Sequence, residues 1–142
     1  MIIKAAILHA RISALYTGPV LSSIEAVTDY LVTAMGCKPR EEVRVLFLNT
    51  QHHLIRDEVV SQGSVTHATV YPREIIKRAL DLGATALIIA HNHPSGDPAP
   101  SQEDIDLTKA LVVAGRALEI RILDHFVIGS GSWVSFREKG ML

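Results

Sequence analysis

Two histidines separated by one residue follow the most apolar segment of the chain. Residues 84–90, Ala-Thr-Ala-Leu-Ile-Ile-Ala, have the continuous aliphatic pattern of a strand buried on both faces, and His91-Asn92-His93 comes directly after it. If the strand continues through the histidines, its two-residue period places His91 and His93 on one face and turns Asn92 to the other. Imidazole nitrogens paired in this way are typical ligands of a metal ion.

A carboxylate follows the histidines after a short, stiff loop. Residues 94–100 contain three prolines and a glycine, Pro-Ser-Gly-Asp-Pro-Ala-Pro, and a helix then begins at Ser101-Gln102-Glu103-Asp104. His91, His93 and Asp104 would supply three ligands to a zinc ion and leave the fourth position for water, whose pKa such an ion brings towards 7. Ser101-x-x-Asp104 is also the pattern of a helix capping box, so a structural role for these two residues stays open.

The spacing of these residues resembles a known motif. The constellation H-x-H-P-x6-S-x2-D is similar to the JAMM (MPN-plus) metalloprotease motif, and its form H-N-H-P-S-G-D-P-x-P-S resembles the RadC family in particular. The similarity extends over residues 20–142 and includes three further segments: Tyr71–Ile76, Leu123–His125 and Val134–Glu138.

The resemblance implies roles for residues outside the histidine loop. In the JAMM pattern an upstream glutamate at the start of a strand acts as general base, which points to Glu41, with Glu42 and Glu58 as alternatives. Ser101 corresponds to the residue that donates a hydrogen bond to the oxyanion of the attacked carbonyl, although capping the helix is an equally open role for it. His125 is expected to support a metal ligand or to be structural.

Composition excludes several classes of protein. The chain has 142 residues, one cysteine and a formal net charge of -1, with 14 Lys+Arg against 15 Asp+Glu. This length suits one domain, and the charge balance does not predict a strong non-specific nucleic-acid binder. One cysteine (Cys37) permits neither an internal disulfide nor a cysteine-based zinc cluster, and it fits the reducing cytoplasm. The sequence shows no membrane-spanning segment and no signal peptide.

The remaining pattern predicts one α/β sandwich built on a mixed sheet. Helices are expected from residue 22 or 23 to 36, from 72 to 82 with Leu80 in the core, and from 101 to about 117 with Ala110 and Val113 in the core. Strands are expected at residues 43–48, 54–60, 64–70, 84–90, 119–123, 126–129 and 133–136. The JAMM resemblance implies the same three-layer architecture, which is similar to the cytidine-deaminase-like fold.

The chain divides into an arm and a domain. Residues 1–19 are interpreted as an N-terminal helical arm or linker, and residues 20–142 as the RadC-like JAMM/MPN domain. RadC proteins carry a small helical domain before such a helix, so the arm would pack on that domain or on a second copy of the chain, which would make a homodimer.

These patterns lead to a zinc-dependent hydrolase of JAMM type, a metallopeptidase that cleaves an amide or isopeptide bond of a peptide or protein substrate. The family label adds a link to DNA repair. Two alternatives stay open: a metal-dependent nuclease, and a non-catalytic interaction module associated with DNA repair. A zinc deaminase is disfavoured because the P-C-x-x-C cysteines of that class are missing.

Overall fold

The computed structural model describes residues 18–36, 38–62 and 70–142. Two predictions lie almost wholly outside these residues: the N-terminal helical arm at residues 1–19, of which only 18 and 19 are described, and the strand at 64–70, of which only the last residue is described. Cys37 also lies outside them. None of the described helices is long and apolar enough to cross a lipid bilayer.

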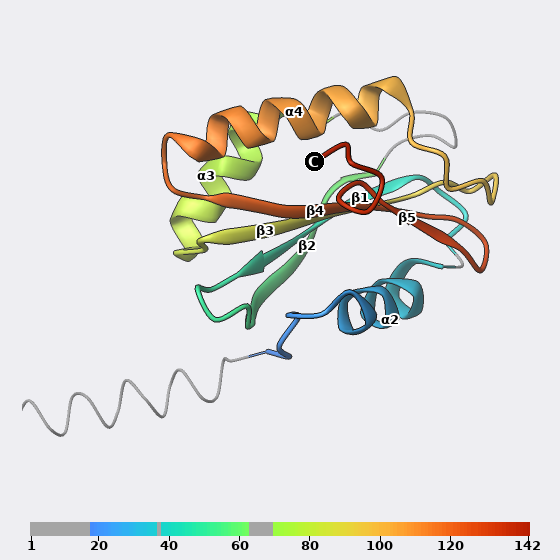
Figure 1. Cartoon of the computed structure of the whole chain (residues 1–142), viewed down its shortest axis with the longest axis horizontal. Coiled ribbons are helices and arrows are strands. Elements are labelled where there is room, and N and C mark those ends of the chain that lie inside the picture. The colour runs from blue at the N-terminus through green and yellow to red at the C-terminus, as the bar shows by residue number, and fades with distance from the viewer. Residues whose placement is uncertain (1–17, 37, 63–69) are drawn as a thin grey trace, which may run out of the picture.

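A five-stranded mixed sheet forms the centre of the described structure (Figure 1), with the strand order β2-β1-β3-β4-β5. β1 pairs antiparallel with β2 and with β3, β3 pairs parallel with β4, and β4 pairs antiparallel with β5. The strands are β1 (Glu42–Leu48), β2 (Leu54–Gln62), β3 (Ala86–Asn92), β4 (Arg121–Ile128) and β5 (Trp133–Ser135). All seven residues of β3 are buried, as its continuous apolar pattern predicts for a central strand.

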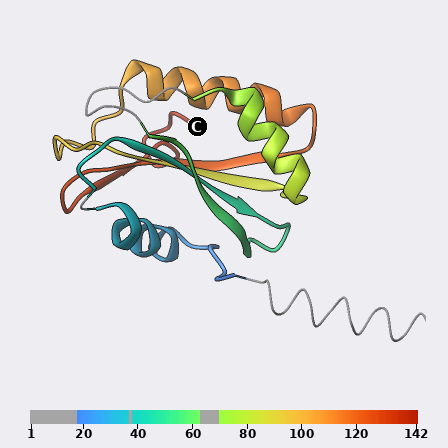
Figure 2. The ribbon, with the colours of Figure 1, turned by 180° about the vertical axis from the view of Figure 1, so that it is seen from behind.

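Helices cover both faces of this sheet. α2 (Ile24–Met35) packs on one face, whereas α3 (Pro72–Leu82) and α4 (Gln102–Arg116) lie on the other, as the two opposite views show (Figures 1 and 2). Each face has its own apolar core: Leu46, Ile88 and Phe126 pack towards α2, while Val45, Ile89 and Leu111 pack on the opposite side. The predicted three-layer α/β sandwich is therefore confirmed.

The boundaries of α3 follow from backbone chemistry at its two ends. Pro72 stands in the first turn, where its missing N–H removes no helical hydrogen bond. Gly83 ends the helix in the left-handed conformation, with φ of 68°, and its N–H bonds to Leu80 O at 3.2 Å. The chain can then turn sharply into the central strand.

Four details of the sequence interpretation are wrong. β4 is one continuous strand rather than two, because Asp124 and His125 interrupt the apolar pattern but are buried and hydrogen-bonded within it. Leu80 of α3 is 54% exposed and Val113 of α4 is 70% exposed, so neither lies in the core. Ala110 is exposed too. The buried face of α4 consists of Asp104, Thr108, Leu111 and Gly115, so two polar residues define half of it.

Candidate metal centre

His91 and His93 lie side by side at the carboxyl end of β3. Their ring centroids are 4.7 Å apart with the planes almost perpendicular, at 88°. Both rings approach Asp104 of α4, which places them on the α4 side of the sheet. The structure therefore brings together the three residues that the spacing predicts as metal ligands, and Asn92 points to the other side, towards the backbone of Arg40 and Glu42.

Asp104 is buried, with only 2% of its surface exposed, and divides its two oxygens between the helix and the histidines. Oδ2 accepts the N–H of Ser101 at 2.8 Å, and the Ser101 hydroxyl oxygen accepts the N–H of Asp104 at 3.1 Å, so the capping box is present. Oδ1 lies 2.6 Å from Nδ1 of His91, and Oδ2 lies 3.4 Å from Nε2 of His93. The cap thus fixes the carboxylate without consuming Oδ1.

The three candidate glutamates occupy different environments. Glu41, 8% exposed, contacts Nε2 of His91. Glu42 lies in contact with Arg44 at 3.2 Å and with Gln62 at 3.1 Å. Glu58 is held by the guanidinium of Arg78, which lowers the pKa of its carboxyl. Among the three, Glu41 is therefore the one that the structure places against a predicted metal ligand.

Strand register explains why Glu41 rather than Glu42 reaches the histidines. β1 and β3 pair with Val43 opposite His91, so these two side chains share a face of the sheet. Continuing this antiparallel register by two residues places Glu41 opposite His93. Because side chains alternate along a strand, Glu42 must point to the other face.

Asn92 holds the segment that carries Glu41. Its side-chain oxygen accepts the N–H of Glu42 at 2.7 Å, and its amide group donates to the carbonyl of Arg40 at 2.9 Å. Asn92 is 3% exposed, so these bonds replace the backbone ladder at the end of the strand pair without help from bulk water. Asn92, which the strand period turns away from the histidines, therefore holds the backbone on either side of Glu41.

The loop fixes the orientation of His93. Its Nδ1 lies 2.9 Å from the carbonyl oxygen of Asp97, which can only accept, so the neutral ring carries its proton on Nδ1 and has a lone pair on Nε2. The hydrogen bond with Asp104 raises the pKa of His93, although burial opposes it. Burial would raise the pKa of Asp104, but its contacts with His91 and His93 outweigh burial and hold that pKa well below its usual range.

The donor set fits a metal ion. Nδ1 of His91 is buried next to Asp104 Oδ1 yet has no hydrogen bond of acceptable geometry among the described residues. Two carboxylates also flank this one imidazole, and a buried cation would offset their charge. Imidazole nitrogen and carboxylate oxygen are ligands that zinc accepts. The described residues contain two groups of three side chains whose donor atoms lie within 4.8 Å of one another inside each group. The first group is Glu41, His91 and His93, and the second is His91, Asp104 and His125.

His125 lies next to this centre from β4, opposite Ile89 of β3. It is completely buried, and its ring stacks on Phe136 at 4.4 Å with an interplanar angle of 16°. Its Nδ1 lies 2.6 Å from the hydroxyl of Thr108, a residue that the sequence interpretation missed. Thr108 stands one helical turn after Asp104, and that i, i+4 spacing is the signal that could have identified it.

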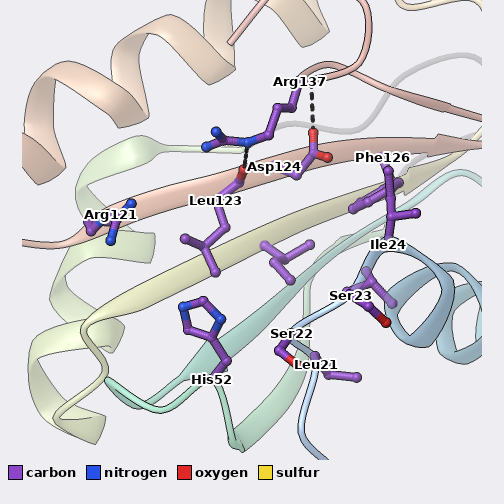
Figure 3. Close-up of a pocket in the computed structure, with 12 residues that line it drawn as sticks. Leu21, Ser22, Ser23, Ile24, His52, Arg121, Leu123, Asp124, Phe126 and Arg137 are labelled. Atoms are coloured by element: carbon purple, nitrogen blue, oxygen red, sulfur yellow. Dashed lines mark hydrogen bonds between the residues drawn. The ribbon is translucent and has the colours of Figure 1, made fainter.

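Asp124, the neighbour of His125, faces the opposite side of the sheet. There it borders a pocket of about 300 Å³ between α2 and β4 (Figure 3). Its carboxylate accepts the N–H groups of His125 at 2.8 Å and Arg137 at 3.0 Å, and the hydroxyl of Ser135 at 2.5 Å. Asp124 thus ties β4 to the C-terminal segment that supplies Phe136, and orients backbone rather than a histidine ring.

Comparison with known proteins identifies the family. Residues 21–141 match the family described as RadC-like JAB domain, and the chain belongs to it. It is 50% identical over 141 residues to a UPF0758 protein of Rhodobacter capsulatus, covering 99% of this chain and 66% of the relative. It is 52% identical over 124 residues to a UPF0758 protein of Methylibium petroleiphilum, covering 87% of this chain and 56% of the relative. The chain therefore spans less than two thirds of the length of both relatives.

Replacing Asn92 should loosen the segment that carries Glu41. Asn92→Ala leaves the buried N–H of Glu42 without its acceptor, and we expect the free energy of unfolding to fall by about 1–3 kcal/mol. Amide hydrogen exchange at Glu42 should become faster. Gln62→Ala is the matched control, because it removes a partner of the Glu42 side chain and leaves this backbone bond intact. An unchanged rate of amide exchange at Glu42 in Asn92→Ala would contradict the role of Asn92 in holding this segment.

Burial of His125 should make stability depend on pH. Desolvation is the main cause that lowers the pKa of His125 to about 3, so below pH 6.5 the unfolded chain binds a proton that the folded chain does not. The stability present above pH 6.5 is therefore lost as the pH falls towards 3, by up to about 1.4 kcal/mol per pH unit. Urea unfolding of the metal-free protein and of His125→Phe between pH 7 and 4 measures this. A difference between the two proteins that does not change with pH would refute the assignment.

Proposed function

We propose that this chain is a zinc-dependent hydrolase of JAMM type that cleaves an amide or isopeptide bond in a peptide or protein. The observation that carries the proposal is the approach of Glu41 and Asp104 to opposite nitrogens of His91, with His93 beside them, in a member of the RadC-like JAB family. In this proposal His91, His93 and Asp104 hold the ion and Glu41 is the general base.

In this proposal the zinc ion and the protein residues have different roles. When bound, zinc polarises the scissile carbonyl and makes a water molecule more acidic. Glu41 then takes a proton from the attacking water and returns it to the leaving amine, a role that its buried position against His91 supports. The rigid placement of Asn92 and Asp104 keeps the groups in position before substrate arrives.

Ser101 can combine its two predicted roles. Its oxygen uses a lone pair to accept the N–H of Asp104, and that bond leaves the hydroxyl proton free to be donated. We infer that this proton is directed at the oxyanion that develops on the attacked carbonyl. The helix cap fixes the hydroxyl in place, so little reorganisation is needed during the reaction.

The substrate and partners belong to the same proposal. A peptide or protein substrate follows from the amide chemistry, whereas the involvement in DNA repair that the RadC resemblance implies is a prediction about the whole protein. A homodimer through the N-terminal arm is likewise a prediction, because residues 1–17 lie outside the described structure.

A single substitution tests the base. Glu41→Gln should keep zinc bound, since Glu41 is not among the three proposed ligands, and should lower the rate of hydrolysis by about 10²–10⁴-fold. The assay measures cleavage of a library of fluorogenic peptides and lysine-isopeptide substrates, with zinc content measured on the same samples.

Glu42→Gln and Glu58→Gln are the controls, because each carboxylate is engaged by an arginine away from the histidines. Both variants should retain at least half of the wild-type rate. Full activity in Glu41→Gln, or a loss confined to Glu42→Gln or Glu58→Gln, would move the base to another residue. The absence of zinc-dependent cleavage by wild-type protein would refute the hydrolase itself.

A further inference from the structure

His125 presents a lone pair to the metal centre. The Thr108 hydroxyl lies 2.8 Å from the backbone carbonyl of Asp104, which can only accept, so the single hydroxyl proton is committed to that carbonyl. The bond between Thr108 and Nδ1 of His125 must then be donated by the ring. His125 is therefore the tautomer with its proton on Nδ1, and Nε2 is an acceptor.

Nε2 of His125 has no hydrogen-bond partner among the described residues, although it is fully buried. An unpaired polar atom in such a place is costly, and the stacking on Phe136 prevents the ring from turning away. Burial also keeps the imidazole neutral at physiological pH, so its lone pair is available to an ion.

One nitrogen of His125 is close to donor atoms of two other buried residues. One donor atom each from His91, Asp104 and His125 lies within 4.8 Å of the other two, and all three residues are buried. Tetrahedral ligands at zinc distances are roughly 3.4 Å apart, so a contraction of at most about 1.4 Å from the 4.8 Å limit would close this group around an ion.

We propose that His91, Asp104 and His125 form a second seat for the metal ion, the inner seat, in which Nε2 of His125 is a ligand. This inference rests on the metal centre of the proposed function. Asp104 approaches Nδ1 of His91, whereas Glu41 approaches Nε2 on the other side of the ring. The inner seat shares His91 and Asp104 with the ligand set of the proposed function, so the two sets differ in whether His93 or His125 completes them.

The test removes the outer ligand His93 and then asks whether His125 matters. Cobalt(II) is the probe, because its visible absorption reports the number and type of ligands, and chelator competition gives its affinity. The proteins compared are wild type, His93→Ala, and His93→Ala combined with His125→Asn. Asparagine can still donate to Thr108 from the position of Nδ1, but it has no atom at the position of Nε2.

We expect His93→Ala to bind one cobalt ion, and the added His125→Asn change to weaken that binding by about tenfold or more and to alter the absorption bands. Circular dichroism and thermal unfolding of the metal-free proteins verify the fold. If the asparagine variant does not fold, His125→Phe, which keeps the ring stacked on Phe136, takes its place.

Equal affinity within twofold and identical spectra for the two variants would overturn the inner seat, as would the absence of cobalt binding by His93→Ala. Either result with a metal-binding wild-type protein leaves the proposed hydrolase intact. Wild-type protein that binds no cobalt or zinc would refute both proposals at once.

Discussion

The pairing of β1 with β3 is the constraint on which the rest of the site depends. With Val43 opposite His91, the residues that share a face are fixed by the two-residue period of the strands. A shift of one residue would replace Glu41 with Glu42 against the histidines and would turn Asn92 towards α4. The apolar residues of β1 and β3 oppose such a shift, because both strands are buried on both faces. Asn92 secures the end of this register where the backbone ladder stops.

Asp104 of α4 has both a structural and a chemical role. Asp104 closes the capping box of α4 and also contacts both imidazoles, so the start of the helix and the geometry of the site are determined together. Thr108 extends the connection by joining the backbone of Asp104 to His125. Polar residues therefore form half of the buried face of α4. The packing of this helix thus depends on the contacts that Asp104 and Thr108 make with the histidines.

Much of the architecture was predictable from local pattern, and the rest depends on long-range contacts. The continuous apolar run before His91 identified the central strand, and Ser101-x-x-Asp104 identified the helix start, because both signals lie within a few residues.

The buried face of α4 was not predictable from hydrophobicity, since Asp104 and Thr108 are buried for hydrogen bonding while Val113 is exposed. Glu41 could not be separated from Glu42 by residue type alone, because the distinction is one of strand register across 50 residues. Asp124 and His125 made β4 look like two strands in the sequence, because polar residues interrupt its apolar pattern. Their hydrogen-bond partners, Ser135 and Thr108, are distant in sequence, so the burial of these two residues could not be predicted.

The central claim is that His91 and Asp104 bind a metal ion, and anomalous diffraction measured on both sides of the zinc absorption edge tests it most directly. Crystals of protein purified without added metal and then equilibrated with zinc should show one strong anomalous peak within about 2.0–2.2 Å of a His91 nitrogen and an Asp104 oxygen. The account is contradicted if no peak appears at these residues, or if zinc binds only elsewhere on the protein while His91 and Asp104 stay in direct contact with each other.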